Sequence, residues 1–120
     1  MEGKGDFMDI LGELVVALAG VLVVVIGRLT ATGRIGRNAF AGIRTKRTMA
    51  DEESWRIAHR GAQPWMIAGG LLLALSGVVA LAVPDPAASA VTIGVGTGLA
   101  LVLTVLGTVT GLRALNNRTL

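Results

Sequence analysis

Three long apolar segments constrain what this chain can fold into more than any other feature. They run from about Phe7 to Gly27, from about Trp65 to Val83 and from about Ala87 to Leu112. An α-helix needs roughly 20 mainly apolar residues to cross the hydrocarbon core of a bilayer. Charged residues make up 16% of the chain, against about a quarter in a typical soluble domain. We therefore expect an all-α membrane protein in which residues 1–120 form a single membrane domain with three transmembrane helices.

The ends of these segments are marked by charge and by proline. Pro84 and Pro86 flank Asp85 between the second and third segments. Proline removes a backbone donor and disfavours helix in the residue before it, so we expect a tight helical hairpin here. Because the N-terminus is acidic and Arg28 directly follows the first segment, we expect that segment to be a mature helix and not a cleaved signal peptide.

Lysine and arginine are concentrated on one side of the expected helices. The connector from residue 28 to residue 64 and the C-terminal tail carry nearly all of them, and positive loops tend to stay in the cytoplasm. We expect an outside N-terminus, a cytoplasmic connector and a cytoplasmic C-terminus in a bacterial plasma (inner) membrane. The basic residues of these regions are Arg28, Arg34, Arg37, Arg44, Lys46, Arg47, Arg56 and Arg60, then Arg113 and Arg118.

Small residues recur at helical spacing in the second and third segments. Bilayer helices associate through close backbone approach, because lipid is as apolar as leucine. We expect these faces to pack the hairpin helices together, with a homodimer or partner interface as the alternative. The residues are Gly70, Ala74 and Gly77 in the second segment and Ala90, Gly94, Gly98, Gly107 and Gly111 in the third.

Glu13 is an acidic residue within the first apolar segment, four residues after Asp9. A carboxylate at the bilayer centre costs about 2.5–3.5 kcal/mol on insertion scales, and less near an interface. One interpretation is that Glu13 reaches the outer head groups. The other is an intramembrane carboxylate that faces the bundle and binds a proton or a ligand.

The connector is polar, and its second half has the pattern of a helix. Thr48 and Asp51 have the spacing of a capping box, and acidic residues follow in the first turn. We expect a short amphipathic helix from about Ala50 to Ala62 that lies flat in the cytoplasmic interface, with Glu52 and Arg56 spaced as an i, i+4 pair. Pro64 is expected to end this helix or to bend it into the second span.

An ordered set of residues in the connector resembles a known family. The pattern N-x-x-x-G-I-R-T-x-x-T followed by W-x-x-x-H is similar to the SdpI family of bacterial membrane proteins. The resemblance implies an immunity protein that protects a toxin-producing cell from its own secreted, membrane-damaging peptide and holds a transcriptional repressor at the membrane. The founding member is longer, with additional spans. The residues that carry the resemblance are Asn38, Gly42, Ile43, Arg44, Thr45, Thr48, Trp55 and His59.

The chemistry of these residues supports two interpretations. In the first they build a structural cap at the membrane surface, in which Arg44 pairs with an acid of residues 51–53 and Trp55 anchors the helix in the interface. In the second they read a ligand or partner, with Arg44 as a fork of donors for carboxylate or phosphate. His59 titrates near neutral pH if it is unperturbed, which would suit a proton-sensitive switch.

The composition makes several function classes unfavourable. With no cysteine and one histidine, the chain offers no nucleophile–base pair, no metal site and no cofactor site, so we expect it not to be an enzyme. Its basic residues are explained by orientation, so we expect no nucleic-acid partner. The expected partners are the bilayer, anionic lipids at the connector, and a peptide toxin or membrane protein, with homo-oligomerisation open. The leading function is a binding and protection module that acts in toxin-peptide immunity or in signalling through the connector motif. The alternative is an accessory subunit that stabilises a larger membrane protein complex.

Overall fold

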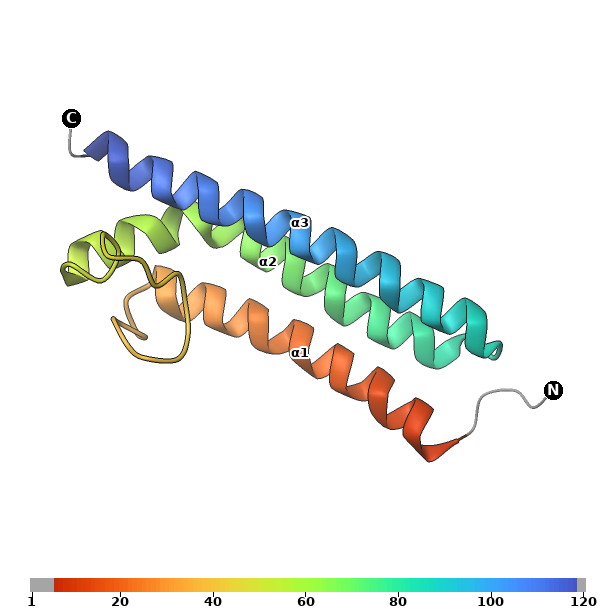
Figure 1. Ribbon diagram of the computed structural model, residues 1–120. Coiled ribbons are helices and arrows are strands. Elements are labelled where there is room, and N and C mark those ends of the chain that lie inside the picture. The colour runs from red at the N-terminus through yellow and green to blue at the C-terminus, as the bar shows by residue number, and fades with distance from the viewer. Residues whose placement is uncertain (1–5, 119–120) are drawn as a thin grey trace.

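The computed structural model describes residues 6–118, which form three long helices and the segments that connect them (Figure 1). They are α1 (Phe7–Ala31), α2 (Glu52–Ala82) and α3 (Pro86–Arg118). All three are long and apolar enough to cross a membrane, and the described residues contain no strand. The molecule is elongated, with extents of 60 × 21 × 19 Å. The expectation of an all-α protein with three membrane-spanning helices is confirmed.

Side-chain caps define where the helices begin. The Asp6 side chain accepts a hydrogen bond from the Met8 backbone N–H at the start of α1 (3.2 Å). At the start of α3 the Asp85 carboxylate accepts one from the Ala88 N–H (2.9 Å), and Pro86 occupies the first helical position, where a missing N–H is tolerated. α2 and α3 therefore form the tight hairpin that the two prolines predict.

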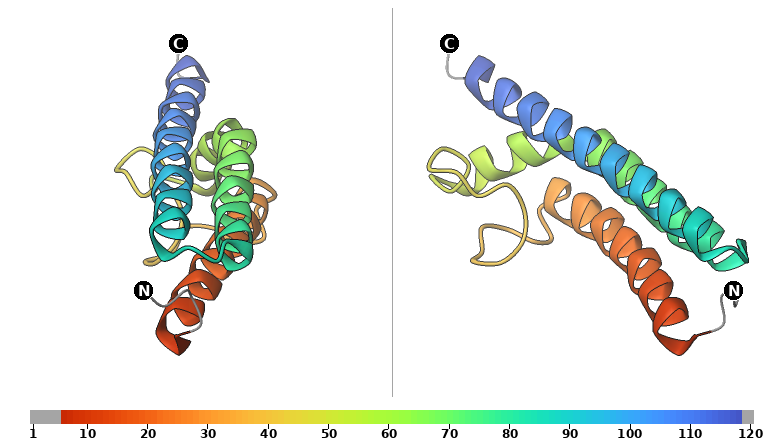
Figure 2. Two further views of the ribbon diagram at one scale, coloured as in Figure 1. Left: turned by 90° about the vertical axis from the view of Figure 1, so that its right-hand side faces the viewer. Right: turned by 45° about the vertical axis from the view of Figure 1, so that its right-hand side comes forward.

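The separate interfacial helix expected from Ala50 to Ala62 is wrong. Those residues form the start of α2, which begins at Glu52 and runs through Pro64 to Ala82 without a break. At about 1.5 Å per residue, a helix of 31 residues is roughly 46 Å long and exceeds the ~30 Å hydrocarbon core. Its first third extends beyond the apolar stretch and leans away from the direction of the rest (Figures 1 and 2).

Packing against protein explains why this part of α2 does not lie flat on lipid. The side chains of Trp55, Ala58 and Ala62 are fully buried. The Ala58 carbonyl approaches Gly111 of α3 so closely that a Cβ at Gly111 would overlap it. The apolar side expected to face lipid is therefore covered by α3 and by the preceding loop.

α2 is the central helix, and it contacts both α1 and α3. A Cβ added at Gly77 would lie 2.6 Å from the Ala17 backbone nitrogen of α1, and one added at Gly70 would lie 2.8 Å from the Gly20 carbonyl oxygen. The small face from Gly70 to Gly77 therefore packs α2 against α1, and not against α3 as expected. Contacts with α3 use a different side of α2, which includes Ser76.

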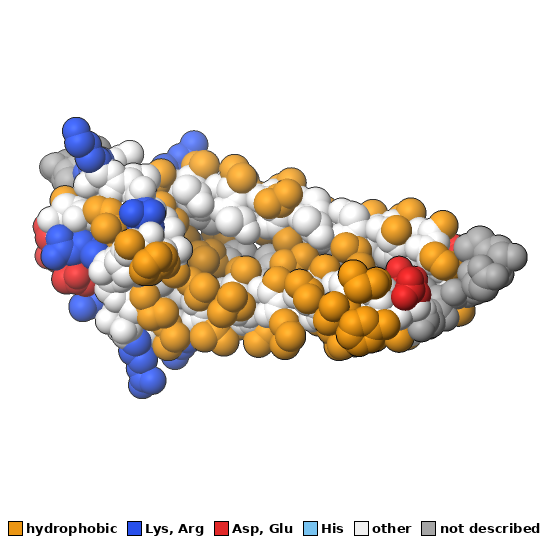
Figure 3. All heavy atoms as spheres, turned by 60° about the horizontal axis from the view of Figure 1, so that its bottom comes forward, with side chains coloured by type: hydrophobic (Ala, Val, Ile, Leu, Met, Phe, Trp, Pro, Cys, Tyr) orange, Lys and Arg blue, Asp and Glu red, His pale blue; other side chains and the backbone are white. Residues whose placement is uncertain are grey.

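The outer surface of the three helices is apolar. In the most apolar 18-residue stretch of each helix, only 17–28% of the residues are buried inside the chain. Figure 3 shows hydrophobic side chains along the body and Lys and Arg side chains gathered at one end. With glycines and alanines at the contacts and large apolar side chains outside, the arrangement is that of helices packed in lipid.

Candidate functional site

The connector folds back on the start of α2 to form a compact cap, which we define as residues 32–62. The cap holds all the connector residues singled out by sequence. It lies at the end of the molecule where α1 ends, which we call the connector end (Figure 1). The opposite end, with Asp6 and the Pro84–Pro86 turn, is the turn end. The cap and a small cavity at the turn end are the two candidate sites.

Trp55 and His59 form the centre of the cap. Both residues are fully buried, and their ring centroids are 4.1 Å apart. The Trp55 indole N–H donates to the Ile35 carbonyl oxygen (2.9 Å). Trp55 therefore ties the loop to α2 and does not anchor the helix in lipid.

Gly42 lies directly against these two rings. Its backbone has a φ of +104°, a left-handed conformation that glycine adopts without steric cost. A Cβ at this position would lie 2.7 Å from His59 Nε2 and 2.7 Å from Trp55 Cη2. Both the backbone conformation and the space therefore require glycine.

His59 is held in one neutral tautomer by its two hydrogen bonds. The Ile43 backbone N–H donates to Nε2 (2.8 Å), so that nitrogen carries no proton. Nδ1 lies 2.7 Å from the Trp55 carbonyl oxygen and donates to it. His59 precedes the apolar stretch that starts at Trp65, and burial lowers its pKa below the usual value, although the bond to the Trp55 carbonyl opposes this.

Asn38 and Thr48 close two turns of the loop. The Asn38 side-chain oxygen accepts from the backbone N–H groups of Phe40 (2.8 Å) and Ala41 (2.7 Å). Thr48 Oγ1 accepts from the Thr45 N–H (2.9 Å) and lies 2.7 Å from the Ile43 carbonyl oxygen. These residues satisfy local backbone groups, as short polar side chains do in turns.

Asp51, and not Thr48, caps α2. Its carboxylate accepts from the Ser54 backbone N–H (2.7 Å), and this hydrogen bond, with a second from the Ser54 side chain, holds the pKa of Asp51 below its usual value. Thr48 is used inside the loop instead. The expected capping box therefore has the correct position for the helix start but the wrong capping residue.

The charged contacts of the cap differ from those expected. Arg44 Nε donates to the Asn38 carbonyl oxygen (3.0 Å) instead of pairing with an acid of residues 51–53. Glu52 pairs with Arg37 (3.0 Å) and not with Arg56. Arg118 of α3 lies 3.4 Å from Glu53. Arg37 and Arg118 carry no sequence motif, so only the folded chain identifies their partners.

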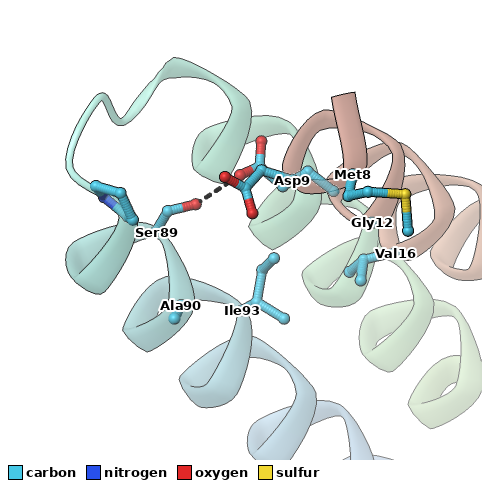
Figure 4. A pocket seen from close by; sticks show the side chains of 9 residues that line it. Met8, Asp9, Gly12, Val16, Ser89, Ala90 and Ile93 are labelled. Atoms are coloured by element: carbon cyan, nitrogen blue, oxygen red, sulfur yellow. Dashed lines mark hydrogen bonds between the residues drawn. The ribbon is translucent and has the colours of Figure 1, made fainter. Parts of the chain in front are cut away.

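At the turn end, Glu13 is buried in the bundle and does not reach outward to the surface. Glu13 is 4% exposed and Ser89 is 3% exposed. The Ser89 hydroxyl donates to Glu13 Oε1 (2.8 Å), which links α1 to α3 (dashed line in Figure 4). Ser89 was not singled out by the sequence, because an isolated serine in an apolar segment has no distinguishing pattern.

The small residues of α3 fall into two groups. Gly107 and Gly111 lie against α2, where a Cβ would overlap Trp65 or the Ala58 carbonyl. At Gly94 and Gly98 an added Cβ would have nothing within 4 Å of it, and Ala90 is exposed beside them. The hairpin instead uses Gly96, whose Cβ would overlap Ser76.

The described residues include no group of three or more His, Asp or Glu side chains that could hold a metal ion. Comparison with known proteins gives one finding. Residues 34–112, about two thirds of the chain, match the model of the SdpI/YfhL protein family. The matched range covers nearly all of the cap, all of α2 and most of α3. No curated protein and no solved structure matches the chain.

Proposed function

This chain belongs to the SdpI/YfhL protein family, and from that membership we propose that it is a membrane-embedded protection module of the immunity type. In this role it binds a membrane-active peptide or a membrane partner and limits damage to the bilayer. The family match over residues 34–112 is the observation that carries the proposal. The multi-pass helical architecture supports it, because such a protein resides where a membrane-damaging peptide acts.

The cap has a structural part in this function. Its buried rings and turn-closing side chains form hydrogen bonds with each other and with the backbone. These bonds favour a role for the cap as a folded scaffold that fixes α2 relative to the loop. The exposed groups around it are then available for contact with lipid or partner. Phe40 is 95% exposed, and Asn38 holds its backbone in a defined turn.

We propose that the connector end faces the cytoplasm and that the N-terminus lies outside. The basic side chains at this end are exposed, among them Arg28, Lys46 and Arg113, and cytoplasmic loops are enriched in such residues. Exposed Arg and Lys beside a protruding Phe40 also suit contact with anionic head groups of the inner leaflet. We propose these lipids as partners of the cap in a bacterial inner membrane.

We further propose that the chain acts by binding and not by catalysis. Its one histidine uses both ring nitrogens in hydrogen bonds within the cap. A general base needs a free nitrogen within reach of a substrate proton. The same bonds argue against His59 as a ligand-reading group in the folded cap.

Expression in a bacterium that lacks related genes tests the protective function. Cells that produce the chain are challenged with a panel of membrane-active peptides, and survival and dye leakage are measured. We expect protection against at least one peptide with the native chain and with Gly33→Ala, and less with Gly42→Ala, whose Cβ would overlap the rings of the cap. Unchanged sensitivity across the panel, with the native chain present in the membrane, would contradict the proposal.

An accessory role in a larger complex is the second candidate. It is favoured by Gly94 and Gly98, which face away from the other helices of the chain and would allow a further helix to approach closely. Purification in mild detergent at native expression distinguishes the two functions. Stoichiometric co-purification of another membrane protein, lost with Gly94→Leu, supports the accessory role, and a chain that purifies alone opposes it.

A further inference from the structure

A cavity at the turn end lies between α1 and α3, with a volume of about 330 Å³. Its walls include Met8 and Val16 of α1 and Ile93 of α3 (Figure 4). The volume is at the lower end of the range for small-molecule sites, ~300–1,000 Å³. It would accept a small head group with part of an apolar chain.

One buried carboxylate gives this apolar cavity its polarity. Glu13 lines the cavity, and its Oε1 is positioned by the Ser89 hydroxyl at 2.8 Å. The hydroxyl comes from α3 and the carboxylate from α1. The Glu13 carboxylate is therefore fixed between two helices, unlike the carboxylate of a mobile surface side chain. In surroundings of low dielectric constant, a carboxylate attracts a cation more strongly than it does in water.

Among the described residues, the charged side chains around the cavity are acidic. The described part of α1 up to Gly27 contains Asp9 and Glu13 and no lysine or arginine, and Asp6 precedes it. The only charged residue between 61 and 112 is Asp85, at the turn beside the cavity. Lys4 lies outside the described residues. This end of the molecule therefore complements a positively charged ligand, whereas the connector end is basic.

We propose that this cavity binds a cationic amphiphile from the bilayer, with an alkylammonium group on Glu13 and its apolar chain against Met8, Val16 and Ile93. A zwitterionic lipid is disfavoured, because its phosphate would lie near Asp9 and the other acids. Because the cavity lies at the turn end, the ligand enters from the leaflet on that side. Glu13 lies outside the range matched by the family, whereas Ser89 and Ile93 lie inside it. The proposal does not rest on the protective function proposed above.

Methionine methyl groups allow this binding to be measured directly. Met8 lines the cavity, whereas Met49 and Met66 lie in the cap and near Gly27. The full chain, labelled with ¹³C at its methionine methyls, is placed in phosphatidylcholine nanodiscs and titrated with dodecylammonium. We expect a saturable shift of the Met8 signal without a matching shift of Met49 or Met66, and no saturable Met8 shift with uncharged dodecanol.

Matched variants separate the carboxylate from general surface charge. Glu13→Gln keeps an oxygen that accepts the Ser89 hydroxyl bond but removes the charge, so it should weaken dodecylammonium binding at least about tenfold. Asp6→Asn removes one charge at the same end and keeps a good N-cap, so it should change the affinity less than about twofold. Folding of each variant is checked from the Met49 and Met66 signals, which should stay at their native positions.

Three results would overturn the proposal. They are equal weakening by Glu13→Gln and Asp6→Asn, equal saturable binding of dodecanol, and displacement of the probe by phosphatidylethanolamine. The first would assign binding to surface charge, the second to apolar partitioning, and the third to a zwitterionic lipid as occupant. Loss of protection in cells with the Met8 titration unchanged would count only against the protective function.

Discussion

Replacing Gly42 by alanine should destabilise the closed cap. The contribution of steric overlap with the two rings can be separated from the contribution of the left-handed backbone conformation by comparison with Gly33→Ala. Gly42 and Gly33 both adopt left-handed backbone angles, with φ of +104° and +81°. At Gly42 a new Cβ would lie 2.7 Å from both His59 and Trp55 ring atoms. At Gly33 it would meet only the end of the Arg56 side chain, at 3.1 Å, and that flexible group can move aside.

The expected free energies follow from these contacts. A left-handed backbone costs an alanine about 1–2 kcal/mol at either position. Forcing a methyl group against two buried rings adds about 1–3 kcal/mol, and only the Gly42 variant has this second cost. We therefore expect Gly42→Ala to destabilise the closed cap by about 2–5 kcal/mol and Gly33→Ala by about 1–2 kcal/mol, from the sum of the two effects.

Limited trypsin digestion in nanodiscs measures the open population of the cap. Cleavage after Arg44, Lys46 and Arg47 requires local unfolding of the loop, so the initial rate at these bonds follows the opening equilibrium when reclosing is fast. A difference of about 1 kcal/mol or more between the variants corresponds to at least about fivefold. Equal cleavage rates for Gly42→Ala and Gly33→Ala would refute the argument that the two rings exclude a side chain at Gly42.

Three further predictions concern the cap and the helix contacts. Burial lowers the pKa of His59, so below pH ~6.5 the unfolded cap binds a proton more readily than the folded cap does, and the stability of the cap falls as the pH drops through that value. The rate of tryptic cleavage in the cap, normalised to that of a free peptide, should therefore rise from pH 7.5 to pH 5.5. A flat profile would be inconsistent with this. Gly77→Ala should lower stability in detergent by about 1–3 kcal/mol, because its Cβ would overlap the α1 backbone. Gly94→Ala should stay within about 0.5 kcal/mol of the native chain. Similar losses of stability in the two variants would speak against the described α1–α2 contact. Glu52→Gln removes a solvent-exposed ion pair with Arg37, so it should lower the stability of the cap by less than about 1 kcal/mol. Strongly accelerated tryptic cleavage would show that this ion pair stabilises the cap more than its exposure suggests.

The sequence predicted the helices well but not the extent of α2. The apolar lengths, the two prolines of the turn and the acidic first turn after Asp51 are local signals, and the structure follows each of them. The short interfacial helix was wrong because its amphipathic pattern shows only that one side must be covered. Periodicity cannot tell whether lipid or α3 covers it, and here α3 and the loop do so.

The cap was partly visible in the sequence. The motif residues were identified as a set, because their spacing matches a family pattern, but their contacts were not. Arg44 bonds to a backbone carbonyl, and Glu52 pairs with Arg37, fifteen residues away. Such partners depend on how the loop turns back, which no local spacing encodes.

By itself, the sequence determined that this chain crosses a membrane with three helices and that most of its basic residues lie in the connector and the C-terminal tail, because segment length and charge act locally. Only the tertiary structure decided which small residues touch which helix, that Trp55 and His59 are buried together against Gly42, and that Glu13 meets Ser89 between α1 and α3. These arrangements depend on the rotation and spacing of whole helices. A face of glycines permits several such packings, and the summed contacts of the folded chain select one.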